Sequence, residues 1–316
     1  MNNAPVIAVF GATGAQGGGL ARAILADPKR AFRVRAITRR PESPAAHALA
    51  QAGAQIVAAD LDDLPSVRRA LEGAQGAFCV TDAFEHGSPE RELAQAEAMA
   101  EAAARASVAH VVWSTLEDTR DFVALGGGTM PVLDGRYNVP HFDAKGEANR
   151  FFIDRRVPTT LLYTSFQWDN LIRYGMAPRR HGDGHLIFSL PMGDRRLPGI
   201  AAEDIGRCAF AIFARGEELV GKAIGIAGEH LTGEQMAEQL GLALGEPVRY
   251  EAVAPEQVRA PDAVRAGQFA AMFRFVHDFE RVHCDARSVA CARELNPRLQ
   301  TFAAWLAAHR HRIPRH

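Results

Sequence analysis

His141 and Lys145 have side chains that can do chemistry, and they stand four positions apart in the sequence. A histidine can donate a proton near neutral pH, and a lysine ammonium can stabilise negative charge that develops during a reaction. A spacing of four residues places both side chains on one face if the segment is helical. His141 is either a proton donor or a structural residue beside a loop, and Tyr137 is a second candidate donor. Lys145 is either part of the site or an exposed lysine on a helix.

Three glycines at intervals of three residues suit an anionic ligand. Gly11, Gly14 and Gly17 follow the apolar residues 6–10, which are typical of a buried strand, and they precede a helix expected over 20–25. Glycine permits the left-handed torsions of a tight turn, which we expect at Gly14, and it lets a phosphate approach the backbone. The start of a helix adds unpaired N–H groups and a positive dipole end.

The glycine turn therefore predicts a pyrophosphate site, the alternative being a glycine-rich turn that binds no nucleotide. Its spacing is G-x-x-G-x-x-G rather than the commoner G-x-G-x-x-G, because Thr13 stands where the second glycine would be. No Lys-Ser/Thr pair follows the glycines, so neither a triphosphate nor its magnesium ion is expected here. The residues expected to contact the pyrophosphate are Gly11, Thr13, Gly14, Ala15, Gln16 and Gly17.

Two arginines stand where an NAD-binding chain usually carries an acid. That acid lies about 20 residues beyond the glycine turn and accepts a hydrogen bond from the ribose 2′-hydroxyl. Here the sequence reads Thr38-Arg39-Arg40. A carboxylate would repel a 2′-phosphate, whereas a guanidinium binds it through charge-assisted hydrogen bonds. We therefore expect NADP(H) as the cofactor, bound by Arg39 with help from Arg40; otherwise the pair is a solvated part of a loop.

Polar residues also follow the later predicted strands, at the sheet edge where ligands bind in open α/β folds. Asp60 is a candidate acceptor for the adenine amino group, and Thr81 is a candidate ribose contact. Small polar residues at these places can equally cap the next helix. Phe84 and Phe166 either cover the nicotinamide or belong to the core. The complete set of strand-end candidates is Asp60, Leu61, Thr81, Asp82, Phe84, Ser114, Thr115 and Phe166.

Strand-like and helix-like segments alternate through the first half of the chain. Strands are expected over 6–10, 32–38, 55–59, 76–80, 109–114 and 159–163. Helices are expected between them over 44–52, 64–71, 90–106 and 143–155. Because parallel strands need crossover connections, and these are right-handed, the pattern predicts an α/β fold with a doubly wound parallel sheet of the Rossmann type.

The expected domains follow from where this alternation is interrupted. Residues 1–165 are expected to form an NADP-binding Rossmann domain, completed by about 200–228. Residues 166–199 and 229–316 are expected to form a smaller α+β domain for a substrate or a partner. Within the first domain, residues 118–143 are rich in glycine and proline and are expected to be irregular, which is typical of functional or mobile segments.

Composition excludes several classes of function. The chain has 316 residues and a net charge of −1 with acids and bases interspersed, which argues against direct nucleic-acid binding and against anionic membrane surfaces. No apolar run reaches the roughly 20 residues that span a bilayer. The four cysteines lack C-x-x-C spacing and fit reduced thiols better than disulfides or a zinc site. We expect a cytoplasmic protein with no bound metal.

The segment around Lys145 resembles the short-chain dehydrogenases, whose Tyr-x-x-x-Lys pair supplies a proton-donating phenol and a lysine that holds the nicotinamide ribose. More closely, the chain resembles their atypical branch, the NmrA-like family, over nearly its full length. The stretches that carry the resemblance are Gly11 to Gly17, Thr38-Arg39, Asp60-Leu61, His141-Phe142-Asp143-Ala144-Lys145-Gly146-Glu147, Asp169-Asn170-Leu171 and residues 228–240. The resemblance implies an NADP-binding Rossmann domain, a small C-terminal domain, and a cleft over the nicotinamide.

By the same resemblance, Lys145 holds the nicotinamide ribose, but His141 occupies the position of the tyrosine. The branch is similar both to NADPH-dependent reductases of quinones and other small unsaturated compounds and to non-catalytic NADP(H) sensors that regulate a protein partner. We expect a reductase that passes hydride to a quinone-like or other small unsaturated substrate. With a quinone the missing tyrosine is tolerable, because the reduced oxygen can take its proton from water. The alternative is a redox sensor in which NADP(H) sets the conformation of residues 118–143. The substrate and the oligomeric state, a homodimer included, stay open.

Overall fold

The computed structural model describes residues 4–126, 130, 132–133, 135–258, 260 and 262–314, which fold into two compact units. The first unit comprises residues 1–117, 144–163 and 202–224, and the second comprises 118–143, 164–201 and 225–316. Residues 118–143, which the sequence places in the first domain, therefore belong to the second unit.

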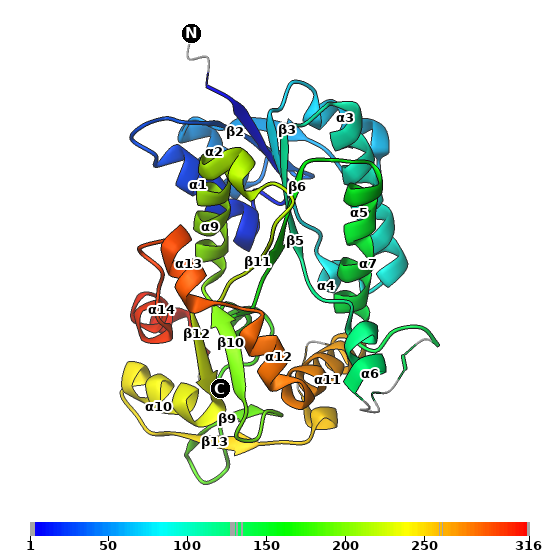
Figure 1. Cartoon of the computed structure of the whole chain (residues 1–316). Helices are drawn as coiled ribbons and strands as arrows, with labels where there is room; N and C mark the ends of the chain where they lie inside the picture. The colour runs from blue at the N-terminus through cyan, green and yellow to red at the C-terminus, as the bar shows by residue number, and fades with distance from the viewer. Residues whose placement is uncertain are drawn as a thin grey trace. The chain divides into compact units, whose positions relative to one another are not determined.

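The first unit is built on a seven-stranded sheet with the strand order β11-β6-β5-β4-β1-β2-β3 (Figure 1). The neighbouring strands from β6 to β3 all pair in parallel. The predicted doubly wound Rossmann-type sheet is thus confirmed. Its strands are β1 (Val6–Val9), β2 (Arg33–Thr38), β3 (Gln55–Ala58), β4 (Gly76–Cys79), β5 (His110–Thr115), β6 (Thr159–Tyr163) and β11 (Ala223–Gly225).

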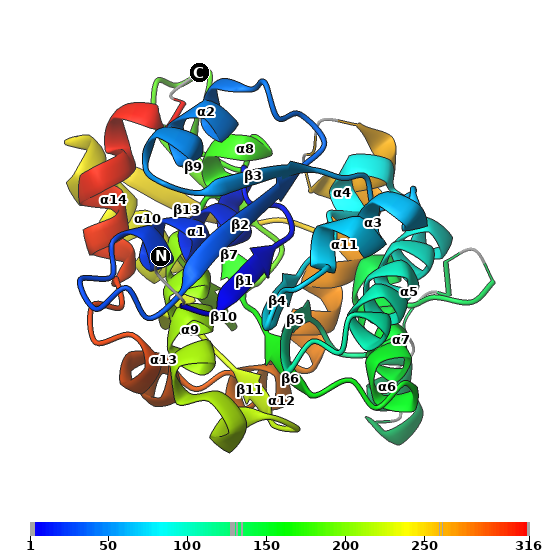
Figure 2. The ribbon, with the colours of Figure 1, turned by 90° about the horizontal axis from the view of Figure 1, so that it is seen from above.

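Helices cover both faces of this sheet, as Figure 2 shows: α1 and α9 lie on one side, and α3, α5 and α7 lie on the other. Buried alanines on α5, such as Ala96, Ala100 and Ala103, let that helix pack closely on the strands. The helices are α1 (Ala15–Leu25), α2 (Pro44–Gln51), α3 (Leu64–Leu71), α4 (Ala83–His86), α5 (Pro89–Arg105), α7 (Pro140–Asp154), α9 (Ala202–Arg215) and the 3-10 helix η1 (Gly216–Leu219).

Helix α1 begins at Ala15 rather than near residue 20, so the glycines at 17–19 lie inside the helix. Glycine is a poor helix former, which is why the sequence suggested a later start. Close backbone packing explains the difference. A Cβ at Gly17 would lie 2.5 Å from the carbonyl oxygen of Phe10, and a Cβ at Gly19 would lie 2.8 Å from Cα of Glu203 on α9. Side chains at these positions would push α1 away from β1 and from α9.

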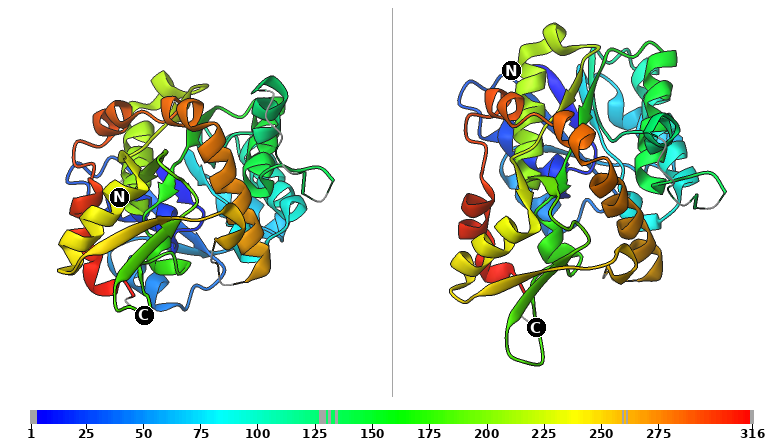
Figure 3. Two further views of the ribbon diagram at one scale, coloured as in Figure 1. Left: turned by 90° about the horizontal axis from the view of Figure 1, so that it is seen from below. Right: turned by 60° about the horizontal axis from the view of Figure 1, so that its bottom comes forward.

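The second unit contains two three-stranded sheets, ordered β12-β10-β7 and β13-β9-β8, with helices around them (Figure 3). Trp168 packs against Phe302 and covers Gly199, where a side chain would clash with the indole. The strands are β7 (Phe166–Gln167), β8 (Arg179–Arg180), β9 (Leu186–Leu190), β10 (Arg196–Ile200), β12 (Glu229–Thr232) and β13 (Val248–Ala252). The helices are α6 (Thr119–Gly126), α8 (Asn170–Arg173), α10 (Gly233–Leu244), η2 (Pro255–Gln257), α11 (Ala263–Asp278), α12 (Glu280–Asp285), α13 (Val289–Leu295), α14 (Phe302–His309) and η3 (Arg310–Arg312).

The expectation of an irregular segment over 118–143 is wrong at both of its ends. Helix α6 occupies Thr119–Gly126, and α7 already begins at Pro140, where proline suits the first position of a helix. Residues 127–129, 131 and 134 lie outside the described part of the chain.

Replacing Gly206 by alanine tests the packing of α9 on α1. A Cβ at Gly206 would overlap the backbone of α1 at Leu20 N and would lie 2.8 Å from the carbonyl oxygen of Gln16. We expect Gly206→Ala to lower the free energy of unfolding in urea by about 3 kcal/mol, because a backbone neighbour cannot rotate away. The matched control is Gly267→Ala on α11, where a Cβ meets nothing within 4 Å and alanine should be neutral or slightly stabilising. Equal stability of the two variants would contradict this packing.

Candidate functional site

The turn between β1 and α1 is built on two glycines that adopt different conformations. Gly11 adopts φ +62°, the left-handed conformation that favours glycine, whereas Gly14 has φ −91° and caps the helix. The expectation of a left-handed Gly14 is therefore wrong: the turn places that torsion at Gly11. A Cβ at Gly14 would lie 3.1 Å from the carbonyl oxygen of Gly11, so space at this position is tight. Gly14 brings no side chain to the N–H groups of the first turn of α1.

Neighbouring strands hold this turn through polar side chains. Thr13 Oγ1 lies 3.4 Å from Thr38 Oγ1 at the end of β2. Ser114 Oγ on β5 donates a 2.7 Å hydrogen bond to Gln16 Oε1. Three of the predicted contact residues, Thr13, Gln16 and Ser114, thus lie with Thr38 at the carboxyl-end edge of one sheet.

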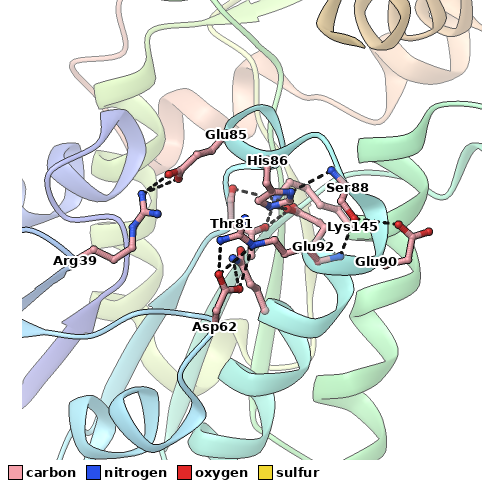
Figure 4. Close-up of polar contacts among 11 residues, drawn as sticks. Arg39, Asp62, Thr81, Glu85, His86, Ser88, Glu90, Glu92 and Lys145 are labelled. Carbon is pink, nitrogen blue, oxygen red and sulfur yellow. Dashed lines mark hydrogen bonds and ion pairs between the residues drawn. The ribbon is translucent and has the colours of Figure 1, made fainter.

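Arg39, expected to bind a phosphate, forms an ion pair with Glu85 on α4 (Figure 4). Arg39 Nη2 donates to both carboxylate oxygens, at 2.5 and 2.7 Å. Both side chains are nearly half exposed. The backbone N–H of Arg40 donates to Thr38 Oγ1 over 3.1 Å, which fixes the start of the loop after β2. The sequence around Arg39 does not indicate an acidic partner, because Glu85 lies 46 residues further along the chain.

The other strand-end candidates contact a local turn, the core or a neighbouring helix. The Asp60 carboxylate accepts the N–H of Asp62 over 3.0 Å, which is a turn within the loop. Leu61 packs against the core. Thr115 Oγ1 lies 2.8 Å from Asn149 Oδ1 on α7. Asp82 precedes α4 at its N-cap position without a side-chain capping bond, and Phe84 is half-buried in α4.

Lys145 lies in a buried polar cluster at the ends of β4 and α5. Its Nζ is 2.6 Å from Glu92 Oε1, 2.5 Å from Thr81 Oγ1 and 3.3 Å from the Thr81 carbonyl oxygen. These contacts match the three donors of an ammonium group. Nζ also lies 5.2 Å from the centre of the Trp113 ring, within cation–π range. The alternative of an exposed surface lysine is wrong, since the residue is buried.

Glu92 completes this cluster and was not a predicted site residue. Its side chain is fully buried, and Oε1 accepts a hydrogen bond from the Thr81 hydroxyl. Its Oε2 lies 3.4 Å from His86 Nε2. Burial alone would raise the pKa of the Glu92 carboxyl, but the Lys145 ammonium, with His86 and Thr81, holds that pKa well below its usual range. The ionised Glu92 carboxylate therefore pairs with the Lys145 ammonium inside the protein.

A periodicity signal for Glu92 is present in the sequence. Glu92 stands four residues before Ala96 and seven before Met99, and all three lie on the buried face of α5. An acid on such a face needs a cationic partner, because an unpaired buried charge is strongly unfavourable. Nothing local to α5, however, identifies Lys145 as that partner.

His141 and Asp143 lie in the first turn of α7 and belong to the second unit. The His141 ring is buried and packs edge-on against Phe142, with centroids 4.9 Å apart. The Asp143 carboxylate accepts the backbone N–H groups of Thr119 and Asn138, at 2.8 and 2.7 Å. Burial raises the pKa of Asp143 despite these bonds. Asp143 therefore ties the two ends of residues 119–138 together, a structural role for an acid in the family motif.

Phe166, the last predicted contact, lies on β7 in the second unit. Its ring is buried and packs against Phe273 with centroids 5.9 Å apart. Phe166 is expected either to cover the nicotinamide or to belong to the core. Its contacts within its own unit are those of a core residue. Within the described ranges, no three His, Cys, Asp or Glu side chains are grouped closely enough to hold a metal ion. No helix in those ranges combines the length and apolar character that crossing a bilayer requires.

Breaking the Glu92–Lys145 pair should destabilise the first unit. We expect Glu92→Gln or Lys145→Met alone to lower the free energy of unfolding by about 3 kcal/mol, because each leaves an unpaired charge in the protein interior. The double variant should recover most of this loss. Glu101→Gln on the same helix is the control: its partner Arg68 is partly exposed, so the effect should stay below about 1 kcal/mol. Additive losses in the double variant would contradict the pairing.

The same pair gives a signature in acid. Because the pKa of Glu92 in the folded protein lies below its ordinary value of 4.5, its stabilisation is complete above that value and is lost as the pH falls through the folded pKa. The free energy of unfolding of the wild type, measured with urea, should therefore fall between about pH 5 and pH 3 more steeply than that of Glu92→Gln.

Comparison with known proteins places these features in a family. The family model described as "NmrA-like family" matches residues 3–306. The NmrA-like family domain-containing oxidoreductase FrzB of Cladobotryum sp is 29% identical over 270 residues, which are 79% of this chain and 76% of that protein. NmrA, described as a negative transcriptional regulator and crystallised with NADP, is 23% identical with a TM-score of 0.78, over 97% of this chain and 95% of that chain. The triphenylmethane reductase of Citrobacter sp., crystallised with NADP(H), is 16% identical with a TM-score of 0.74, over 97% and 99%. The chain belongs to the NmrA-like family.

Proposed function

We propose that this protein is an NADPH-dependent reductase that binds its cofactor along the carboxyl-end edge of the seven-stranded sheet. The observation that carries the proposal is the convergence of three features at that edge within one unit: the glycine turn before α1, Arg39 after β2, and Lys145 beside the end of β4. Ligands of open α/β sheets bind at this edge. Relatives named as oxidoreductases, and neighbours crystallised with NADP or NADP(H), support the same proposal.

The glycine turn fits a dinucleotide on structural grounds. The left-handed Gly11 and the closely packed Gly17 bring α1 directly against β1, and Gly14 adds no side chain at the start of the helix. Such a helix start binds a pyrophosphate through backbone N–H groups and the helix dipole. The residues that would contact it are Gly11, Thr13, Gly14, Ala15, Gln16 and Gly17.

Arg39 and Lys145 would hold the two ends of the dinucleotide. The Arg39 guanidinium, after β2, would bind the 2′-phosphate, with Arg40 beside it. The Lys145 ammonium would hold the nicotinamide ribose by giving up its long 3.3 Å contact to the Thr81 carbonyl while Glu92 and the Thr81 hydroxyl keep it in place. When bound, NADPH supplies a hydride from C4 of the nicotinamide.

The acceptor that suits these residues is a flat, electron-poor compound such as a quinone. His141 replaces the tyrosine that donates a proton in typical short-chain dehydrogenases, and its ring is buried in the second unit. A quinone needs no enzymatic acid, because its reduced oxygen takes a proton from water. Orientation of the nicotinamide by Lys145 is then the main contribution of the protein.

Cofactor preference tests the role of Arg39. We expect wild type to bind NADPH more tightly than NADH, and Arg39→Ala to lose about tenfold or more of its NADPH affinity while keeping that for NADH, since a charge-assisted contact contributes about 1.5–3 kcal/mol. Isothermal titration measures both. Arg33→Ala, at the other end of β2, should leave both affinities unchanged. Equal wild-type affinities for the two cofactors would rule out this role.

Turnover tests the reductase itself, with Lys145 and His141 in different roles. NADPH oxidation is followed at 340 nm with a panel of quinones and enones. Lys145→Met should lose about 10²-fold in kcat, because small misplacements of the reacting atoms slow hydride transfer that much. The exposed Lys29→Met is the control, and circular dichroism at the assay temperature shows whether Lys145→Met is folded. His141→Phe should retain its rate with a quinone and lose more with an enone.

No NADPH oxidation by wild type with any acceptor would reject the reductase. A change in limited proteolysis on addition of NADPH would then favour a cofactor sensor that regulates a partner, in line with the description of NmrA as a transcriptional regulator.

A further inference from the structure

The ion pair between Arg39 and Glu85 places an acid beside the proposed phosphate-binding arginine. Glu85 lies on the single-turn helix α4, 46 residues beyond Arg39, and both of its carboxylate oxygens lie within 2.7 Å of Arg39 Nη2. Figure 4 shows Glu85 reaching toward Arg39 and away from the Glu92–Lys145 cluster. The fold thus supplies near the end of β2 the acid that the local sequence Thr38-Arg39-Arg40 lacks.

We propose that Glu85 is a specificity-determining residue for the adenosine ribose. Its carboxylate competes with a cofactor 2′-phosphate for Arg39 and accepts a hydrogen bond from the 2′-hydroxyl of NAD(H). The preference of the wild-type chain for NADP(H) is therefore smaller than Arg39 alone would give. This inference rests on the proposed role of Arg39.

The competition follows from charge. A 2′-phosphate carries up to two negative charges and binds an arginine at the position that the Glu85 carboxylate now occupies. Either Glu85 moves away and Arg39 loses this partner, or the carboxylate stays and repels the phosphate. Both possibilities weaken NADP(H) binding. A 2′-hydroxyl has no such charge and can donate to the carboxylate, as it does to the acid of NAD-binding sites.

Solvent exposure of Arg39 and Glu85 limits the effect of the Glu85 charge on NADPH affinity. Because both side chains are nearly half exposed, solvent screens the pair, and its contribution is that of a surface ion pair with good geometry. Removing the charge of Glu85 should therefore tighten NADPH binding by about fivefold. The change should leave the fold intact, because the Glu85 side chain is nearly half exposed and its ion pair with Arg39 lies at the surface.

Binding measurements on Glu85→Gln test the inference without any assay of turnover. Glutamine keeps the size of the side chain and a carbonyl acceptor for the 2′-hydroxyl while it removes the charge. We expect the dissociation constant for NADPH to fall about fivefold and that for NADH to stay within about twofold. Titrations are run in low-salt buffer free of phosphate, because screening weakens the effect. Glu90→Gln is the matched control: it removes the same charge from the start of α5, where the carboxylate contacts Ser88.

Unchanged or weaker NADPH binding by Glu85→Gln would overturn the inference, as would an equal gain in Glu90→Gln, which would reflect net charge alone. Arg39→Ala, titrated in parallel, separates this outcome from failure of the proposed function. If Arg39→Ala weakens NADPH binding and Glu85→Gln does not tighten it, Glu85 has no role and the role of Arg39 stands. If Arg39→Ala leaves NADPH binding unchanged, the proposed roles of Arg39 and of Glu85 in cofactor binding both fail.

Discussion

The buried ion pair between Glu92 and Lys145 positions the cation of the candidate site within the first unit. An unpaired charge in the protein interior is strongly unfavourable, so neither side chain can leave the other without a replacement partner. Glu92 comes from α5, Lys145 from α7, and the Thr81 oxygens that complete the cluster from the end of β4. The pair therefore fixes two helices to the sheet edge and holds an ammonium group where the proposed nicotinamide end of the cofactor would lie.

The arrangement of the sheet could be predicted from the sequence because it depends on local patterns. Short apolar strands alternate with alanine-rich helices from residue 6 to residue 163, and only a few topologies fit such alternation. The start of α1 could not be predicted in this way. Gly17 and Gly19 lower helix propensity, yet they are the residues that allow α1 to touch β1 and α9. Tertiary packing decided the conformation against propensity.

The candidate site could be predicted only in part, for a related reason. Glycines, arginines and a Tyr-x-x-x-Lys-like pattern are visible in single stretches of sequence, and these gave Gly11, Arg39 and Lys145. Glu85 and Glu92 form ion pairs with residues that lie 46 and 53 positions away in the chain, and no local pattern specifies such pairs. Each acid forms an ion pair with a predicted residue, Glu85 with Arg39 and Glu92 with Lys145. The cations could therefore be predicted from the sequence, whereas their acidic partners are seen only in the fold.

A crystal structure of the wild-type chain grown with NADP⁺ would test the proposed cofactor site, because it would locate the whole dinucleotide at once. We expect the pyrophosphate within hydrogen-bond distance of the backbone N–H groups of residues 12–17 and the nicotinamide ribose beside Lys145, with the Glu92–Lys145 pair intact. A dinucleotide bound away from the carboxyl ends of β1, β2 and β4 would contradict this expectation.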